Sequence, residues 1–173
     1  MSTPRTLVVM RHAKAEQAGP TDFERPLAPR GHGDAAAAGA WLSARGLVPD
    51  HALVSGALRT RETYEHVARG AGLAWSGLEA SYDEGLYAAG VETALDLVRL
   101  VDDAHRHVLL IGHNPTVAHL AQLLDDGDGD VEAATELAMG YPTSATTVFR
   151  YDGSWAHLAP GAARLTGHFV GRG

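Results

Sequence analysis

The sequence predicts an α/β fold of three layers, with helices on both faces of a mostly parallel central sheet. Three short apolar segments carry this prediction, at residues 7–10, 52–54 and 107–111. Each is shorter than a buried helix, which favours a strand. A stretch of helical character follows each segment, and strands that alternate with helices are typical of parallel sheets. Residues 107–111 are the most apolar and are expected at the centre of the sheet.

The helices predicted from apolar spacing and helix-tolerant composition lie between and after these strands. Glycines close the first two helices, and Pro115 stands near the first turn of the fourth, where proline is tolerated. The acidic stretch 125–130 is expected to be a flexible loop. The predicted helices cover residues 31–45, 58–68, 91–101, 116–124 and 132–139.

Further strands are predicted from weaker patterns. Residues 73–79 are expected to form a third strand after the second helix, and residues 82–87 a loop with two carboxylates. Residues 13–29 are rich in proline and should form an irregular loop over the end of the first strand. Strands joined by turns would add antiparallel pairs near the C-terminus. These strands are expected at residues 143–151, 154–158 and 164–169.

Length and composition limit the class of protein. A chain of 173 residues is long enough for a full core, so one domain over residues 1–173 is expected. The net charge of −7 argues against a nucleic-acid surface, which needs clustered Lys and Arg. The chain has no cysteine, which excludes disulfides and thiolate chemistry. Without a signal segment or an apolar run of about 18 residues, we expect a cytoplasmic protein with no membrane partner.

Polar side chains follow all three strong strand candidates at the point where each one ends. Arg11 and His12 follow the first strand, and His113 follows the last. A helix that carries Arg59 begins just after the middle strand. The carboxyl ends of parallel strands open on one edge of a sheet, where ligands bind in α/β proteins. We therefore expect two histidines and at least two arginines in one pocket.

This set of side chains suits a phosphoryl group better than a metal ion. Guanidinium groups offer a planar fork of donors that matches phosphoryl oxygens, and backbone N–H groups near Asn114 add donors for an anion. Arginine charge repels a metal ion, so a metallohydrolase built on His12 and His113 is a less favoured alternative. A neutral imidazole can attack phosphorus, and Arg11 and Arg59 are expected to lower the pKa of His12. His113 can donate a hydrogen bond to a phosphoryl oxygen.

Several segments, taken in their order, resemble a known enzyme family. Residues 7–12 (LVVMRH), 54–63 (VSGALRTRET) and 108–115 (VLLIGHNP) resemble motifs of the histidine phosphatase superfamily. Residues 25–27 (RPL) and 141–143 (YPT) resemble its small SixA-like branch. The name-giving members of that branch dephosphorylate phosphohistidine on signalling proteins. The resemblance implies a phosphoglycerate mutase-like fold and a metal-independent phosphatase without a cofactor.

The resemblance also implies roles for individual residues. His12 corresponds to the nucleophile that forms a covalent phosphohistidine intermediate, and Arg11, Arg59 and His113 correspond to the phosphate pocket. The chain departs from the usual motif at Ala13, which stands where the superfamily has glycine after the Arg-His pair. A small residue is kept there, so the pocket is expected to form in the same way.

The general acid is the part of the site that the motifs specify least. Larger relatives use a carboxylate from the loop after the third strand, and Glu84, preferred over Asp83, is the candidate here. The SixA-like branch manages without such an acid, since a leaving imidazole needs a proton less than an alkoxide does. Arg25 is expected to close over the pocket, and Asn114 to help bind the phosphate.

The sequence therefore predicts a phosphatase that acts on a phosphorylated substrate, with a phosphohistidine-bearing signalling protein as the favoured partner. Two alternatives stay open. One is a small-molecule phosphomonoesterase of the same fold, and the other is a non-catalytic module that only binds phosphate in the same pocket.

Overall fold

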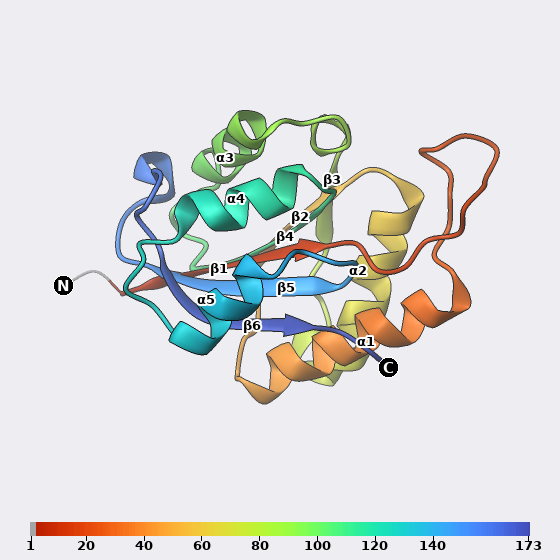
Figure 1. The fold of residues 1–173 in the computed structure, drawn as a ribbon, viewed down its shortest axis with the longest axis horizontal. Helices are drawn as coiled ribbons and strands as arrows, with labels where there is room; N and C mark the ends of the chain where they lie inside the picture. The colour runs from red at the N-terminus through yellow and green to blue at the C-terminus, as the bar shows by residue number, and fades with distance from the viewer. Residues whose placement is uncertain (1–2) are drawn as a thin grey trace.

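A single sheet of six strands forms the centre of the molecule (Figure 1). The computed structural model describes residues 3–173; Met1 and Ser2, which the sequence places before the first strand, lie outside the described residues. Across the sheet the strands follow the order β3-β2-β4-β1-β5-β6. The first four strands pair in parallel, and β5 runs antiparallel to both β1 and β6. The strands are β1 (Arg5–Arg11), β2 (His51–Ser55), β3 (Ala80–Asp83), β4 (His107–Gly112), β5 (Ala145–Tyr151) and β6 (Arg164–Val170).

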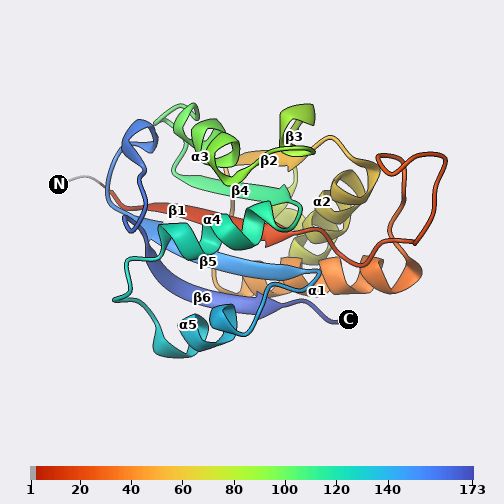
Figure 2. The same ribbon diagram turned by 45° about the horizontal axis from the view of Figure 1, so that its top comes forward.

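Helices cover both faces of this sheet and produce the predicted three layers (Figure 2). On one face lie α1 (Pro29–Ala44) and α2 (Leu58–Ala71). On the other face lie α3 (Val91–Arg99), α4 (Thr116–Leu124) and α5 (Val131–Ala138). The predicted α/β class and the central position of the fourth strand are confirmed. Among residues 3–173, no helix combines the length and apolar character needed to cross a membrane.

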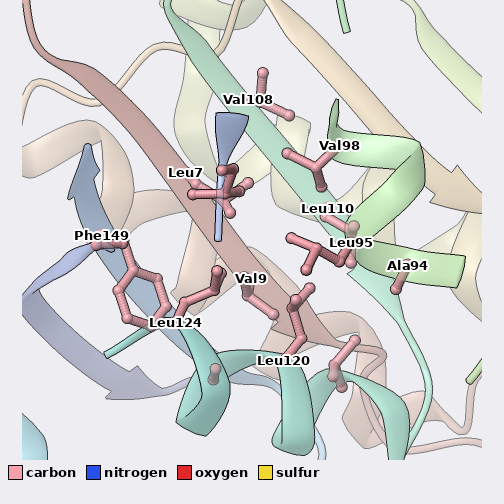
Figure 3. Close-up of a cluster of buried hydrophobic side chains, with 14 of the residues drawn as sticks. Leu7, Val9, Ala94, Leu95, Val98, Val108, Leu110, Leu120, Leu124 and Phe149 are labelled. Atoms are coloured by element: carbon pink, nitrogen blue, oxygen red, sulfur yellow. The ribbon is translucent and has the colours of Figure 1, made fainter. Parts of the chain in front are cut away.

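Alternate residues of β1 face the two apolar cores. Leu7 and Val9 point into the core under α3 and α4 (Figure 3). Val8 and Met10 belong to the core under α1 and α2. All four side chains are almost completely buried. A parallel strand covered on both faces must be apolar at every position, which explains the unbroken run that ends at Arg11.

The backbones of α1 and α2 touch, because each helix has a glycine at their crossing. A Cβ atom added at Gly39 would lie 1.9 Å from the carbonyl oxygen of Val67. A Cβ atom added at Gly70 would lie 2.0 Å from the carbonyl oxygen of Ala36. Neither position accepts a side chain without separating the helices. This contact fixes α2 against the sheet, and α2 carries Arg59.

The predicted strand at residues 73–79 is wrong. The chain forms a 3-10 turn at Gly72–Trp75, in which Leu73 is 91% exposed and Trp75 is buried. The edge strand of the sheet is β3, and a second 3-10 turn, Glu84–Leu86, follows it inside the expected loop. The side chains of β3 are mostly exposed, so apolar content could not reveal a strand that is held by its backbone pairing with β2.

The predicted strand at residues 154–158 is also wrong. This segment contains the 3-10 turn Trp155–His157, which joins β5 to β6. Trp155 and Leu158 are fully buried at the end of the core under α3, so this short apolar segment resembles a buried strand although its two buried residues are three positions apart. Trp155 is held by its indole N–H, which donates to the carbonyl oxygen of His105 at 2.8 Å.

Candidate active site

The carboxyl ends of β1 and β4 bring two histidines to one place. In the parallel register of these strands Arg11 pairs with Gly112, so His12 and His113 leave the sheet at the same level. The backbone N–H of His12 donates to the carbonyl oxygen of Gly112 at 3.1 Å. The two imidazole rings lie 5.3 Å apart, centroid to centroid, and are tilted by 54°.

His12 is held in one tautomer by the main chain. Its Nδ1 atom lies 2.7 Å from the carbonyl oxygen of Ala13, which can only accept, so Nδ1 carries the proton. The lone pair is therefore on Nε2. Burial, with smaller contributions from His113, Arg11 and Arg59, lowers the pKa of His12 to about 3. Desolvation thus outweighs the arginine charges that the sequence suggested as the cause, and the ring is a neutral nucleophile at physiological pH.

His113 is oriented by a hydroxyl group from the neighbouring strand. Its Nε2 atom lies 2.7 Å from Ser55 Oγ, which also accepts the backbone N–H of Ala57 at 3.4 Å. The Ser55 hydroxyl can donate its proton to Nε2 while its oxygen accepts from Ala57, and we assign this arrangement, which leaves the imidazole proton on Nδ1. Burial, followed by the charge of Arg59, lowers the pKa of His113 to about 4, so this histidine donates as a neutral ring.

Arg11 and Arg59 are anchored through their terminal nitrogens. Arg11 Nη1 donates to the carbonyl oxygen of Tyr141 at 3.2 Å. Arg59 Nη1 donates to the carbonyl oxygen of Asp22 at 2.8 Å, and Arg59 Nη2 lies 3.3 Å from Asp22 Oδ2. The Nε atoms of both arginines are buried and have no hydrogen-bond partner within the described part of the chain, nor has His113 Nδ1.

These three nitrogens are donors, because a guanidinium Nε always carries a proton and His113 Nδ1 carries one in the tautomer set by Ser55. Buried donors without a partner are rare, and each costs about 1–3 kcal/mol. They belong to residues beside His12: the rings of His12 and His113 lie 5.3 Å apart, and the charges of Arg11 and Arg59 act on the His12 imidazole. An anion with several oxygens satisfies all of them together, which is the chemistry of a phosphoryl group.

Asn114 supports this pocket through a shared carbonyl group. Its side-chain amide donates to the carbonyl oxygen of Tyr141 at 2.8 Å, the same oxygen that binds Arg11. The phenol of Tyr141 is buried and donates to the carbonyl oxygen of Val9 at 2.6 Å. Tyr141 therefore connects the start of α4 with β1. The helix α4 begins two residues after Asn114, at Thr116.

Two residues that sequence reasoning missed complete the entrance. Asp22 lies in the loop between β1 and α1, and Tyr87 follows the 3-10 turn after β3. The Tyr87 hydroxyl donates to Asp22 Oδ2, and the Tyr87 ring stands edge-on to His113, 5.6 Å away. Arg25 donates from Nε to Asp22 Oδ1 at 3.0 Å. The loop reaches the pocket through Asp22, which contacts Arg59, whereas Arg25 donates to Asp22 and to the carbonyl oxygen of Glu16. The closure of Arg25 over the pocket stays a prediction, and no spacing or apolar pattern in the sequence identified these contacts.

Glu84 lies close to this entrance without a contact to the phosphate pocket. It is exposed, and a Cβ atom added at Gly56 would lie 3.3 Å from Glu84 Cγ and 3.3 Å from Phe23 Cζ. Within residues 3–173, Glu84 makes no side-chain hydrogen bond or ion pair with Arg11, Arg59 or either histidine of the pocket. Its role as a general acid therefore stays a prediction.

The neighbouring surface is apolar and open. A groove of about 660 Å³ lies beside the entrance, between the loop after β1 and the start of α2. It is lined by Ala18, Gly19, Pro20, Phe23, Glu24, Pro26, Gly56, Leu58 and Arg61. Across the described chain, no group of three or more His, Asp or Glu side chains is arranged to hold a metal ion.

The fold and this pocket define a phosphatase of the α/β class. The chain belongs to the histidine phosphatase superfamily, and its resemblance to the SixA-like branch is confirmed. The sequence model of the histidine phosphatase superfamily (branch 1) matches residues 7–87. This match ends with Tyr87 and includes Arg11, His12, Arg59 and Glu84.

Relatives and solved structures agree with this assignment over nearly the whole chain. An uncharacterized protein of Mycobacterium tuberculosis, MT1313, is 39% identical over 165 residues, which cover 94% of this chain and 100% of that protein. A proposed phosphohistidine phosphatase SixA from Nakamurella multipartitia is 32% identical, with a TM-score of 0.84 and 98% of both chains covered. A second one, from Agrobacterium tumefaciens, is 30% identical with a TM-score of 0.78 and covers 98% of this chain and 99% of its own.

Proposed function

We propose that this phosphatase is a SixA-like protein phosphohistidine phosphatase that works through a covalent phosphohistidine on His12. The observation that carries the proposal is a set of buried, unpartnered donors on the residues beside a neutral nucleophile. Arg11 Nε, Arg59 Nε and His113 Nδ1 all lack partners, and His12 has its lone pair on Nε2. A module that only binds phosphate has no need for a buried histidine held as a nucleophile.

The reaction proceeds in two displacements. The lone pair of His12 Nε2 forms the N–P bond, and the bond from phosphorus to the leaving atom breaks with its electron pair on that atom. Arg11, Arg59 and His113 donate to the phosphoryl oxygens as their charge changes, and Asn114 and Arg25 keep the pocket and its loop in place. Water then attacks phosphorus and releases inorganic phosphate and free His12.

Two observations favour a protein substrate over a small phosphoester. Two solved structures with 30% identity or more carry the phosphohistidine phosphatase name. The groove beside the entrance is open and largely apolar, which suits the surface of a protein better than a small polar ester. A phosphohistidine-bearing signalling protein is therefore the proposed partner, and a cytoplasmic location stays a prediction.

Phosphoenzyme trapping tests the proposal. The protein is mixed with a radiolabelled phosphohistidine protein and quenched within milliseconds to seconds, and the label is followed through acid and alkali. Acid-labile, alkali-stable label is expected on the wild type and on His107→Ala, since His107 is an exposed residue at the opposite end of β4. Label that persists in His12→Ala contradicts the assignment of the nucleophile, and turnover without any phosphoenzyme contradicts the mechanism.

A further inference from the structure

Among residues 3–173, Asp22 is the carboxylate that contacts an arginine of the phosphate pocket. It lies in the loop that leaves the carboxyl end of β1 and projects from that edge of the sheet (Figure 1). Its carboxylate accepts hydrogen bonds from the Tyr87 hydroxyl, from Arg25 Nε at 3.0 Å and from Arg59 Nη2 at 3.3 Å. Two distant segments of the chain and a neighbour in the same loop therefore meet at one acidic side chain at the entrance.

The carboxylate keeps the capacity to accept another hydrogen bond. An ionised carboxylate has about four acceptor positions, and protein groups occupy three of them. The side chain of Asp22 is 56% exposed, so the remaining position is open to a bound molecule. Oδ2 accepts from Tyr87 and Arg59 and Oδ1 accepts from Arg25, so the open position is on Oδ1. The carboxylate lies beside the pocket, since it contacts Arg59 and its charge acts on His113.

The charges around Asp22 keep it ionised. The groups that face it are Tyr87, Arg59 and Arg25, with His113 behind Tyr87. The hydrogen bond from Tyr87, helped by the charges of Arg59 and Arg25, lowers the pKa of Asp22 to about 2. An ionised carboxylate cannot give a proton to a leaving oxygen, so Asp22 can act only as an acceptor.

We propose that Asp22 is a specificity-determining residue, which accepts a hydrogen bond from the distal ring N–H of a phosphoimidazolium substrate and thereby selects N-linked over O-linked phosphoryl groups. This inference rests on the proposed function and names the leaving-group class that the site takes. A phosphorylated imidazole can carry a proton on the nitrogen that is not bonded to phosphorus. A negative charge beside that nitrogen favours the protonated ring.

The protonated ring is also the better leaving group. When His12 Nε2 attacks, the P–N bond of the substrate breaks and its electron pair stays on the substrate nitrogen. The distal nitrogen keeps its proton, so the ring departs as neutral imidazole and no general acid is needed. An O-linked substrate leaves as an oxyanion, which the charge of Asp22 repels and to which Asp22 offers no proton.

The test compares Asp22→Asn with the wild type on two substrates, phosphoimidazole and p-nitrophenyl phosphate, with the intact protein. The main-chain carbonyl of Asp22 still anchors Arg59 in this variant. Because a charged hydrogen bond is lost, kcat/KM for phosphoimidazole is expected to fall about tenfold or more. That for p-nitrophenyl phosphate is expected to stay within about threefold of the wild type or to rise, because the charge that repels its leaving oxyanion is gone. The alkaline limb of kcat for phosphoimidazole is expected to move to lower pH, since the bound ring loses its proton more easily.

Tyr87→Phe is the matched control, because it removes one hydrogen bond to Asp22 and keeps the charge of its carboxylate. The ratio of kcat/KM for phosphoimidazole to that for p-nitrophenyl phosphate should stay near the wild-type ratio. Equal losses on both substrates with an unmoved alkaline limb would mean that Asp22 only positions Arg59, and would overturn the inference. A wild type that dephosphorylates p-nitrophenyl phosphate through a phosphoenzyme but leaves phosphoimidazole intact also overturns it, while the phosphatase mechanism stands. Absence of a phosphoenzyme with both substrates overturns the proposed function itself.

Discussion

Ser55 Oγ lies 2.7 Å from His113 Nε2, so Nδ1 is the ring nitrogen of His113 that is left to bind a ligand. Ser55 ends β2 and His113 follows β4, its parallel neighbour in the sheet. The register between these two strands therefore sets the tautomer of His113. With Nε2 occupied, Nδ1 is the nitrogen that carries a proton and has no protein partner.

Replacement of His113 by alanine is expected to lower kcat/KM by about 10- to 100-fold, the range of one hydrogen bond to a charged group. The phosphoryl oxygen that Nδ1 serves loses its donor, while His12 remains able to attack. Steady-state kinetics with a phosphohistidine substrate measure the loss. His107→Ala serves as the control, and an undiminished rate in His113→Ala would remove His113 from the mechanism.

Arg59→Lys is expected to weaken inhibition by inorganic phosphate about 10- to 100-fold. Both terminal nitrogens of Arg59 contact Asp22, and its Nε atom has no protein partner and can bind phosphate. A single lysine ammonium cannot contact Asp22 and the phosphate in the same way. Inhibition constants at fixed ionic strength report the change. Arg61→Lys is the matched control on the same helix, because Arg61 donates to the carbonyl oxygen of Gly56 and lies over the Tyr82 ring. Equal inhibition in Arg59→Lys and wild type would show that Nε does not bind phosphate.

The free energy of unfolding is expected to decline as the pH falls from about 6.5 toward 4. Burial holds the pKa of His12 at about 3 and that of His113 at about 4 in the folded protein, below the ordinary value of 6.5. The unfolded chain therefore binds these protons first, so the stability is complete above pH 6.5 and is lost on acidification. Burial also lowers the pKa values of His51, His66 and His168, which add to the slope.

Urea unfolding of the wild type and of His12→Asn at several pH values separates the contribution of the nucleophile. The variant is expected to lose less stability between about pH 6.5 and about pH 4.5, because one proton fewer is taken up on unfolding. Parallel curves for the two proteins would show that His12 is not held neutral by burial.

Gly39→Ala and Gly70→Ala are expected to destabilise the protein by about 1–3 kcal/mol or more, because each new methyl group meets a carbonyl oxygen of the facing helix. Gly33→Ala is the control within α1, since a Cβ atom there would be 3.5 Å from its nearest neighbour, an ordinary contact. It should be neutral or stabilising by up to about 1 kcal/mol. Thermal unfolding measures all three, and a neutral effect at Gly39 would contradict the close approach of the helices.

The parts that could be predicted from sequence share one physical basis. Strands buried on both faces must be apolar at every position, so the apolar runs predicted β1 and β4. The polar residues just after these runs, His12 and His113, then indicated the site. The edge strand β3 gave no such signal, because none of its side chains is fully buried and its backbone pairs with β2 alone. Asp22 and Tyr87 could not be found, since their contact joins two irregular segments whose meeting depends on the finished fold.

The nucleophile and the proposed specificity residue lie on different kinds of segment, and this has an evolutionary consequence. The nucleophile is carried by a strand with neighbours on both sides, whereas Asp22 and Tyr87 stand on connections that tolerate insertion and exchange. Substitutions at a few loop positions can change which leaving group is preferred. The residues that perform phosphoryl transfer stay the same. A gene duplicate could thus change its target long before its reaction changed.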